Sequence, residues 1–261
     1  MEQSRKLICL LGVKIDVVTA ADLIKDIHQL IETKTRSAVF YVNPDCLNKA
    51  YIDDDYRSIL NAADLVYADG VGVVIAARLA RQYLPDRITA IDIFHDLCHT
   101  WAQQGIQLFL LGSNDKRNEL ACSRLQAAHP QLKIVGHHHG YFHWDSDLNQ
   151  RVIEQINCSE PDVLLVGFGA PHQEKWIAKH MDQLNVRLCW GVGGLFDLLS
   201  GNLKRGPALF HQHHLEWFCR LMITPGKVWK RYLIGGPQFF MRVILFEHLN
   251  RTKRAKKLGV I

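Results

Sequence analysis

A carboxylate stands where a buried strand turns into a helix. The apolar segment Leu65–Ala68 has the pattern of a buried strand, and it stops at Asp69-Gly70, a dipeptide typical of turns. Gly72 then begins an apolar, alanine-rich helical pattern. Open parallel α/β sheets bind ligands at the carboxyl ends of their strands, so Asp69 is placed to be the reactive carboxylate. The alternative is that Asp69 caps the helix that follows it.

Three more polar side chains follow predicted strands. Asn43 comes directly after one strand, at the same kind of place as Asp69. Gln173 lies in the first turn after another strand, where its amide could reach a ligand hydroxyl; otherwise it is a solvated helix residue. Asp197 follows a glycine-rich turn, and its alternative role is to cap a helix or to pair with Lys204 or Arg205.

Glycine-rich turns follow three of the predicted strands. None continues as the Gly-x-Gly-x-x-Gly fingerprint of a first βα unit, so a nicotinamide site is poorly supported. The chain also lacks the P-loop motif and the Gly-x-Ser-x-Gly elbow. Glycine before a helix N-terminus exposes N–H groups that suit phosphate, and three such turns favour a ligand with a diphosphate. The turns contain Gly70 and Gly72, Gly167 and Gly169, and Gly191 and Gly193.

No metal site and no cofactor is expected. Histidines 137–139 lie in a predicted loop, but three adjacent histidines cannot all point one way, and no carboxylate or cysteine stands at ligand spacing. The acidic run 53–55 opens a helix, where the helix dipole explains it. A diphosphate would therefore be held by backbone amides and basic side chains rather than by a metal.

These residues can meet at one edge of a sheet only if strands alternate with helices along the chain. The hydrophobic pattern of the sequence predicts this alternation. This alternation is typical of a mostly parallel α/β sheet with helices on both faces. After Gln173, we expect Glu174 and Lys175 to be solvated and Trp176 to lie in the core. The predicted strands are 7–17, 38–42, 65–68, 106–111, 132–135, 162–166 and 186–190.

The composition is that of a folded domain with reduced cysteines. The chain has 261 residues and is 48% hydrophobic, enough for a sizeable core. No apolar run reaches the roughly 18–20 residues of a membrane-spanning helix, and the N-terminal apolar run is short for a secretory signal. Seven cysteines without a Cys-x-x-Cys pair indicate reduced thiols in a cytosolic protein.

Positive charge is concentrated at the C-terminal end. Residues 218–261 hold ten Lys or Arg against one Glu, so they carry about +9 of a chain whose net charge is +5. Apolar and aromatic stripes interleave with these charges, and 225–226 and 235–237 are expected to break the stretch into three helices. Basic amphipathic helices with a polybasic end favour an anionic membrane surface; the alternative is a helical cap with a solvated face. We therefore divide the chain into a core, 1–207, and an appendage, 208–261.

Four segments of the chain resemble the WecG/TagA/CpsF family of bacterial glycosyltransferases (glycosyltransferase family 26). The resemblance spans roughly residues 8 to 245, and its most specific string is Gly167-Phe168-Gly169-Ala170-Pro171-His172-Gln173-Glu174-Lys175-Trp176. The other segments are Asn43-Pro44 with Ala68-Asp69-Gly70-Val71-Gly72, Gly191-Val192-Gly193-Gly194-Leu195-Phe196-Asp197 with Gly201 and Lys204-Arg205-Gly206-Pro207, and Leu215-Glu216-Trp217 with Arg220-Leu221 and Pro225.

The resemblance implies an inverting transfer of a sugar from a nucleotide-diphosphate donor, such as a UDP-sugar, to a polyprenyl-diphosphate-linked saccharide. It implies that no metal or other cofactor is required. It also implies a Rossmann-like α/β core and a C-terminal basic helical appendage. The appendage would dock on the cytoplasmic face of the bacterial inner membrane and complete the active site.

By position, the family's catalytic carboxylate falls on Asp69. The chain departs from the family at Tyr41, where Thr is frequent, at Ala90, where Gly is usual, and at Lys227, which replaces an Arg and loses its bidentate fork for phosphate. These departures leave the donor sugar open. The family's other pocket and appendage residues fall on Asn43, Arg87, Gln173, Asp197, Arg220, Lys227, and Lys230 or Arg231.

The resemblance agrees with the chemistry of the residues. A general base takes the proton from the acceptor hydroxyl as it attacks the sugar, and Asp69 is placed for that role. The basic residues of the appendage could neutralise the diphosphates. Two alternatives are a nucleic-acid-binding α/β protein, disfavoured by the apolar stripes beside the charges, and a sugar-nucleotide epimerase, disfavoured by the missing dinucleotide fingerprint. A homo-oligomer also stays open.

Overall fold

The computed structural model describes residues 5–33, 35–85, 87–203, 218, 221–222 and 225–257. The side chains of 225, 227 and 249–257 fall outside this description. Arg220, Lys204, Arg205 and the predicted boundary between residues 207 and 208 lie outside the described residues. The division into a core and an appendage therefore stays a prediction.

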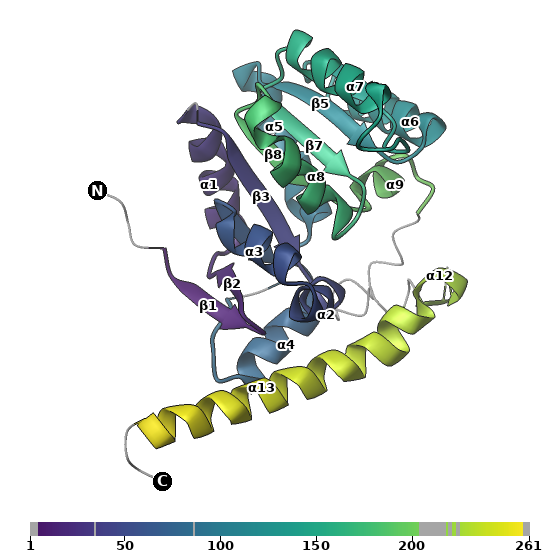
Figure 1. Cartoon of the computed structure of the whole chain (residues 1–261). Coiled ribbons are helices and arrows are strands. Elements are labelled where there is room, and N and C mark those ends of the chain that lie inside the picture. The colour runs from purple at the N-terminus through teal and green to yellow at the C-terminus, as the bar shows by residue number, and fades with distance from the viewer. Residues whose placement is uncertain are drawn as a thin grey trace.

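Six strands form the central sheet in the order β4-β3-β8-β7-β5-β6, and every neighbouring pair is parallel (Figure 1). The predicted fold class, a Rossmann-like α/β core with helices flanking a parallel sheet, is confirmed. The strands are β3 (Ser37–Val42), β4 (Leu65–Ala68), β5 (Gln107–Gly112), β6 (Lys133–His138), β7 (Val163–Gly167) and β8 (Leu188–Gly191). The core helices are α1 (Ala20–Glu32), α2 (Pro44–Ile52), α3 (Asp54–Ala62), α4 (Val71–Leu79), α5 (Ala90–Gln104), α6 (Asp115–Ala128), α7 (Asp147–Cys158), α8 (His172–His180), with the short 3₁₀ turn η1 (Met181–Gln183) after it, and α9 (Leu195–Leu199).

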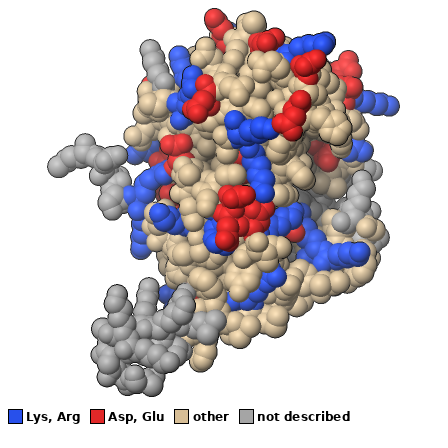
Figure 2. All heavy atoms as spheres, viewed as in Figure 1, with Lys and Arg blue, Asp and Glu red and all other residues tan. Residues whose placement is uncertain are grey.

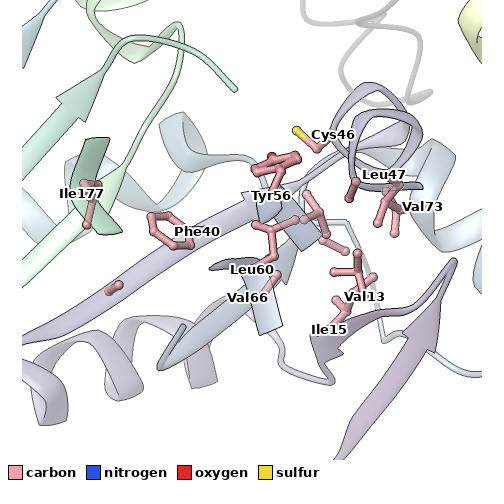
Figure 3. Packing of buried hydrophobic residues seen from close by; sticks show 14 of the residues in the cluster. Val13, Ile15, Phe40, Cys46, Leu47, Tyr56, Leu60, Val66, Val73 and Ile177 are labelled. Carbon is pink, nitrogen blue, oxygen red and sulfur yellow. The ribbon is translucent and has the colours of Figure 1, made fainter. Parts of the chain in front are cut away.

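Each face of the sheet packs into its own apolar cluster. Val39 belongs to the cluster beneath α1, α5 and α6, whereas its neighbour Phe40 belongs to the cluster beneath α2, α3 and α8. Side chains alternate along a strand, so consecutive residues enter opposite clusters. Figure 3 shows the second cluster, in which Phe40 lies between Tyr56 and Ile177. Because both faces are covered, the edge with the strands' carboxyl ends is where turns can form a site.

The predicted strand 7–17 is wrong as a single element. It forms an antiparallel hairpin of β1 (Leu7–Leu10) and β2 (Val13–Asp16), separate from the main sheet. The chain reverses at Leu11 and Gly12, which both have positive φ angles, 50° and 83°. The apolar pattern was continuous because Leu10, Leu11 and Val13 are all buried, so the turn carried no polar signal.

Most of the segment between residues 204 and 224 lies outside the described residues, but residues 225–257 form one continuous helical stretch, which we call the C-terminal helical stretch. It consists of α12 (Pro225–Trp229), a π-helical turn η2 (Lys230–Ile234) and α13 (Gly235–Lys257). The expected break at 235–237 does not occur. Pro237 has no N–H and its ring crowds the preceding turn of the helix. The wide π-helical turn, which ends at Ile234, lies on the N-terminal side of the proline, where this crowding falls.

Helix α13 lies beside α2 and α4 of the core (Figure 1). Phe239 and Val243 are its buried anchors, at 0% and 1% exposure. Asn48 of α2 donates to the Gly235 carbonyl at 2.7 Å, and Arg242 donates to the Asn48 side-chain oxygen at 2.9 Å. Apolar and polar contacts together hold α13 against the core. Within the described residues, none of the helices has the length and apolar character needed to span a membrane.

Candidate active site

A pocket of about 400 Å³ opens beside Asp69, and we call it the Asp69 pocket. The start of α2, the turn between β4 and α4, the loop 87–89 and the C-terminal helical stretch all contribute to it. Most of its wall is apolar, from residues such as Val71, Ile75 and Phe240. Its polar lining consists of Asn43, Asp45, Asp69, Arg87, Thr89, Arg231 and Tyr232.

Asp69 reaches this pocket because β4 ends one residue before it. Its backbone N–H donates to the Val42 carbonyl at 2.8 Å, so the turn is tied to the neighbouring strand. The N-cap position of α4 is Gly70, with a φ of 88°, and Asp69 lies one residue before it. Asp69 therefore does not occupy the N-cap position itself. Gly72 lies against Pro44, since an added Cβ would come within 2.7 Å of the proline ring.

Asn43 is the N-cap of α2 and lines the same pocket. Its side-chain oxygen accepts from the N–H groups of Asp45, at 3.0 Å, and Cys46, at 3.1 Å. The oxygen is thus engaged in capping, and any contact with a ligand falls to the NH₂ group. Asn43 and Asp69 each follow a strand end, as predicted from the sequence, and the structure shows that the two strands, β3 and β4, are neighbours in the sheet.

Two arginines bring positive charge into the Asp69 pocket. Arg87, from the loop before α5, has a side chain only 12% exposed, and its guanidinium lies 3.8 Å from the Asp92 carboxylate. Arg231, half-buried in the π-helical turn, faces it from the C-terminal stretch. Lys230 is exposed, with its ammonium 5.6 Å from the Trp229 ring, and does not line the pocket. The resemblance left Lys230 and Arg231 as alternatives for one basic residue of the family's appendage, and the geometry favours Arg231 for that position.

A second pocket of about 400 Å³, the aromatic pocket, lies at the same edge of the sheet. The turns that follow β5, β6, β7 and β8 form it. Asp197 lines it and accepts from Arg117 at 3.1 Å and from Ser113 at 3.5 Å. Arg117 is thus one ion-pair partner of Asp197, and a pairing with Lys204 or Arg205, which lie outside the described residues, stays a prediction. The aromatic lining consists of Tyr141, Trp144, Phe168, His172 and Phe196.

Sequence reasoning missed most of the aromatic pocket. Ser113 closely follows the predicted strand 106–111, but no role in a site was predicted for it. Tyr141 and Trp144 lie in an irregular loop, and Arg117 lies in the first turn of α6. A polar turn after a strand end was the one available signal, and it would have pointed to Ser113 alone.

Tyr41 of β3 lies between the two pockets. Strand β3 is flanked by β4, which leads to Asp69, and by β8, which leads to Gly193 of the aromatic pocket. A Cβ added to Gly193 would come within 2.2 Å of the Tyr41 hydroxyl, so the phenol rests against that turn. Burial first, and then the nearby Cys46, Glu174 and Asp69, raise the pKa of Tyr41 well above its usual value. The phenol is therefore a neutral hydroxyl between the pockets.

Gln173 lies behind the aromatic pocket and lines neither of the two pockets among the described residues. Its side chain is fully buried, which excludes the alternative of a solvated helix residue. The amide oxygen accepts from the N–H of Gly169 at 3.2 Å and from the N–H of Gly193 at 2.9 Å. Gln173 thus joins two of the turns that form the pocket.

The expectation that Glu174 is solvated is wrong. Its side chain is fully buried beside Gln173, whose amide NH₂ donates to it at 2.9 Å. Lys175 is half-buried and pairs with Asp53 at 2.7 Å. Trp176 is fully buried, as predicted. Gln173, Glu174 and Trp176 are buried because α8 packs between α3 and the sheet, which a helical pattern of charged residues does not reveal.

Burial raises the pKa of Glu174 to about 7, opposed by its hydrogen bonds and by Lys49. A raised folded pKa means that the protonated form stabilises the fold below about pH 4.5, and that this stabilisation is lost as the pH rises through 7. We expect wild type to lose roughly 3 kcal/mol relative to Glu174→Gln between pH 4.5 and pH 8. Denaturant unfolding of both proteins at these pH values measures the difference. A constant difference between the two proteins would contradict the expectation.

Among the described residues, no group of three or more His, Cys, Asp or Glu is placed to hold a metal ion. His138 belongs to β6, which is longer than the predicted strand, and His139 follows it. Their rings stack on one another with centroids 4.3 Å apart and lie near Phe142. These histidines pack into an aromatic cluster behind the pocket.

Comparison with known proteins places this geometry in a family. The profile of the Glycosyl transferase WecG/TagA/CpsF family matches residues 8–254. An N-acetylglucosaminyldiphosphoundecaprenol N-acetyl-beta-D-mannosaminyltransferase of Bacillus subtilis (strain 168) is 33% identical over 222 residues, which cover 85% of this chain and 84% of the relative. A protein of the same name from Staphylococcus aureus (strain MRSA252) is 32% identical over 224 residues, 85% of each chain.

Proposed function

The chain belongs to the WecG/TagA/CpsF family of glycosyltransferases, and from this premise we propose the reaction that it catalyses. It is a glycosyltransferase that acts on a polyprenyl-diphosphate-linked sugar in the synthesis of a bacterial cell-wall polysaccharide. The donor is a UDP-sugar, such as UDP-N-acetylmannosamine, its uronic acid or UDP-glucose. The transfer inverts the anomeric carbon and needs no metal.

The observation that carries the proposal is a carboxylate and two arginines in one largely apolar pocket. Asp69 takes the proton from the acceptor hydroxyl, whose oxygen forms a bond to the anomeric carbon. The bond from that carbon to the donor's diphosphate breaks, and UDP leaves with the electron pair. Arg87 and Arg231 stabilise the negative charge that develops on the diphosphate of the leaving UDP. Guanidinium groups, which offer paired donors to phosphate oxygens, take the place that a metal has in other enzymes.

The aromatic pocket suits the nucleoside part of the donor. Its aromatic side chains offer surfaces for a base, and Ser113, Arg117 and Asp197 offer polar groups for a ribose or a base edge. A donor that spans from this pocket past Tyr41 would place its sugar near Asp69.

One assay tests the donor, the acceptor and the absence of a metal together. A panel of UDP- and GDP-sugars is incubated with polyprenyl-diphosphate monosaccharides and disaccharides, and the products are read by mass spectrometry. We expect transfer from one or a few UDP-sugars, at an unchanged rate in EDTA. Transfer that stops in EDTA and returns with Mg²⁺ or Mn²⁺ would refute metal independence, and no transfer from any UDP-sugar would refute the donor class.

We further propose that the enzyme docks on the cytoplasmic face of the inner membrane. Large apolar side chains are exposed on α4 and along the C-terminal helical stretch, next to the opening of the Asp69 pocket. Figure 2 shows that acidic side chains gather on the core above α13, while the part of this face that α13 forms is mainly uncharged and basic. Such a surface suits an anionic membrane that carries the lipid-linked acceptor. The exposed residues are Ile75, Leu79, Tyr83, Trp229, Leu233, Ile234, Met241, Ile244 and Leu245.

The double substitution Ile244→Glu/Leu245→Glu should lower vesicle binding at least about tenfold, because two charges replace side chains that enter the headgroup region. Both positions are more than half exposed, so the fold should tolerate the change. Sedimentation with anionic vesicles measures it. The control is Leu148→Glu, an exposed leucine on α7 far from α13, which should bind like wild type (Figure 1). Equal binding of the double variant and wild type would contradict the docking surface.

A further inference from the structure

Two buried side-chain amides hold together the turns that form the aromatic pocket. Asn118 of α6 donates to the carbonyl of Gly112, at 2.8 Å, and to that of His138, at 3.0 Å. Gln173 accepts from the N–H groups of Gly169 and Gly193. Each amide therefore bridges the ends of two neighbouring strands. The spacing of the four turns, and with it the width of the pocket, depends on these two side chains.

The Gln173 amide can do this in only one of its two orientations. Its oxygen must face both glycine N–H groups, because a rotated amide would set an NH₂ group against two donors. In the observed orientation the NH₂ group donates to Glu174 at 2.9 Å. Side chains of adjacent helix residues normally diverge by about 100°, so the contact between Gln173 and Glu174 is not a routine helix contact. Glu174 supplies the acceptor that selects the working orientation.

The surroundings of Glu174 leave it free for this role. It is fully buried next to Tyr41, Cys46 and Tyr56, and its second carboxyl oxygen has no hydrogen-bond partner among the described residues. It lines neither pocket in the described part of the chain. Whether ionised or neutral, the carboxyl group offers an oxygen to the amide of Gln173. A direct contact between Glu174 and a substrate is excluded by its burial.

We propose that Glu174 is a positioning residue of the aromatic pocket, which fixes the Gln173 amide so that its oxygen holds the turns at Gly169 and Gly193 in the spacing that admits the donor. The proposal rests on the proposed function in taking this pocket as the donor site. Its structural half, the ordering of the two turns, can be measured without any ligand.

Amide hydrogen exchange at Gly169 and Gly193 tests the structural half. Glu174→Met keeps the size of the side chain but removes the acceptor, and we expect exchange at both glycines to accelerate at least about tenfold. Glu174→Gln keeps an acceptor oxygen and should stay within about twofold of wild type. Amides of β3 and α5 should be unchanged in both variants. Unchanged exchange at the two glycines in Glu174→Met, equal acceleration throughout the chain, or identical behaviour of the two variants would each overturn the proposal.

UDP binding, measured by calorimetry, tests the functional half. We expect Glu174→Met to bind UDP about tenfold more weakly than wild type. Its KM for the donor should rise, while its KM for the acceptor stays unchanged. Glu174→Gln should have the UDP affinity and the donor KM of wild type. If wild-type protein does not bind UDP but the exchange result holds, the donor assignment fails and the positioning role stands. If wild type and Glu174→Met bind UDP equally well, the positioning role is refuted and the donor assignment stands.

A double-mutant cycle tests whether Glu174 orders the two turns through the Gln173 amide. Gln173→Met removes the bridge itself and should accelerate exchange at Gly169 and Gly193 as much as Glu174→Met does. Adding Glu174→Met to Gln173→Met should then change exchange at the two glycines by less than about twofold, because Glu174 acts only through the amide. Additive effects of the two substitutions would show that Glu174 supports the turns by another route and would overturn the proposal.

Discussion

Replacing Asp69 by Asn should lower kcat by about 10³-fold, within the 10²- to 10⁴-fold range that general-base catalysis contributes. Asn has the same size as Asp but cannot take the proton from the acceptor hydroxyl. The backbone of the turn should stay in place, because the bond from the Asp69 N–H to Val42 and the N-cap at Gly70 involve no carboxylate. The measurement is steady-state turnover with a saturating UDP-sugar and a lipid-diphosphate acceptor, with circular dichroism as a check on the fold.

Asp45 provides the matched control. It lines the same pocket, but its carboxylate pairs with Lys49 at 2.8 Å on α2. Asp45→Asn removes a negative charge from the same pocket without removing the proposed base, and its kcat should stay within about tenfold of wild type, as expected for a half-exposed ion pair. If Asp69→Asn turns over at the wild-type rate, or if Asp45→Asn loses as much as Asp69→Asn, then Asp69 is not the base.

The carboxylate was predictable because a short buried strand, a turn dipeptide and a helix follow one another within fifteen residues, from 65 to 79. That local order fixes Asp69 at the strand's carboxyl end whatever the rest of the chain does. Asn43 was predictable for the same reason, with Pro44 marking the helix start. Parallel pairing of β3 with β4 then makes the two side chains neighbours, which a sequence pattern implies only if the order of the strands is known.

The environment of α8 was not predictable from its own sequence. Gln173, Glu174 and Lys175 have the composition of a solvated helix start, yet the first two are fully buried. They are buried because α8 packs against α3 and against the turns after β7 and β8, which are distant in the sequence. Long-range packing overrides local polarity wherever buried polar groups satisfy each other, as the Gln173 amide and its partners do.

The C-terminal stretch was misread for a different reason. Gly235, Gly236 and Pro237 are strong breakers in an isolated helix, but packing of Phe239 and Val243 on the core keeps α13 helical up to the π-helical turn. Because the stretch is continuous, the orientation of Arg231 is tied to that of α13. This coupling decides which basic residue of the stretch enters the Asp69 pocket.

Arg231→Gln should lower kcat/KM by about 10²- to 10³-fold, because a cation next to the departing diphosphate is the kind of charge stabilisation that gives the largest single contributions to rate. The loss should appear mainly in kcat, since the charge on the diphosphate grows as the bond to the sugar breaks. Arg231→Lys should recover only part of the rate, because an ammonium group lacks the bidentate fork. Turnover at several concentrations of donor and acceptor separates these effects.

Lys230→Gln is the matched control, since it removes the same charge from the adjacent position of the same π-helical turn. Lys230 points away from the pocket and lies over Trp229, so its variant should keep kcat/KM within about threefold when the acceptor is a short-chain analogue in detergent. The observed packing of α13 on α2 and α4 therefore predicts the larger loss of kcat/KM in Arg231→Gln. A larger loss in Lys230→Gln than in Arg231→Gln would contradict this prediction. It would mean that the C-terminal stretch is rotated by about one residue in the working enzyme, and that the described pocket is not the catalytic one.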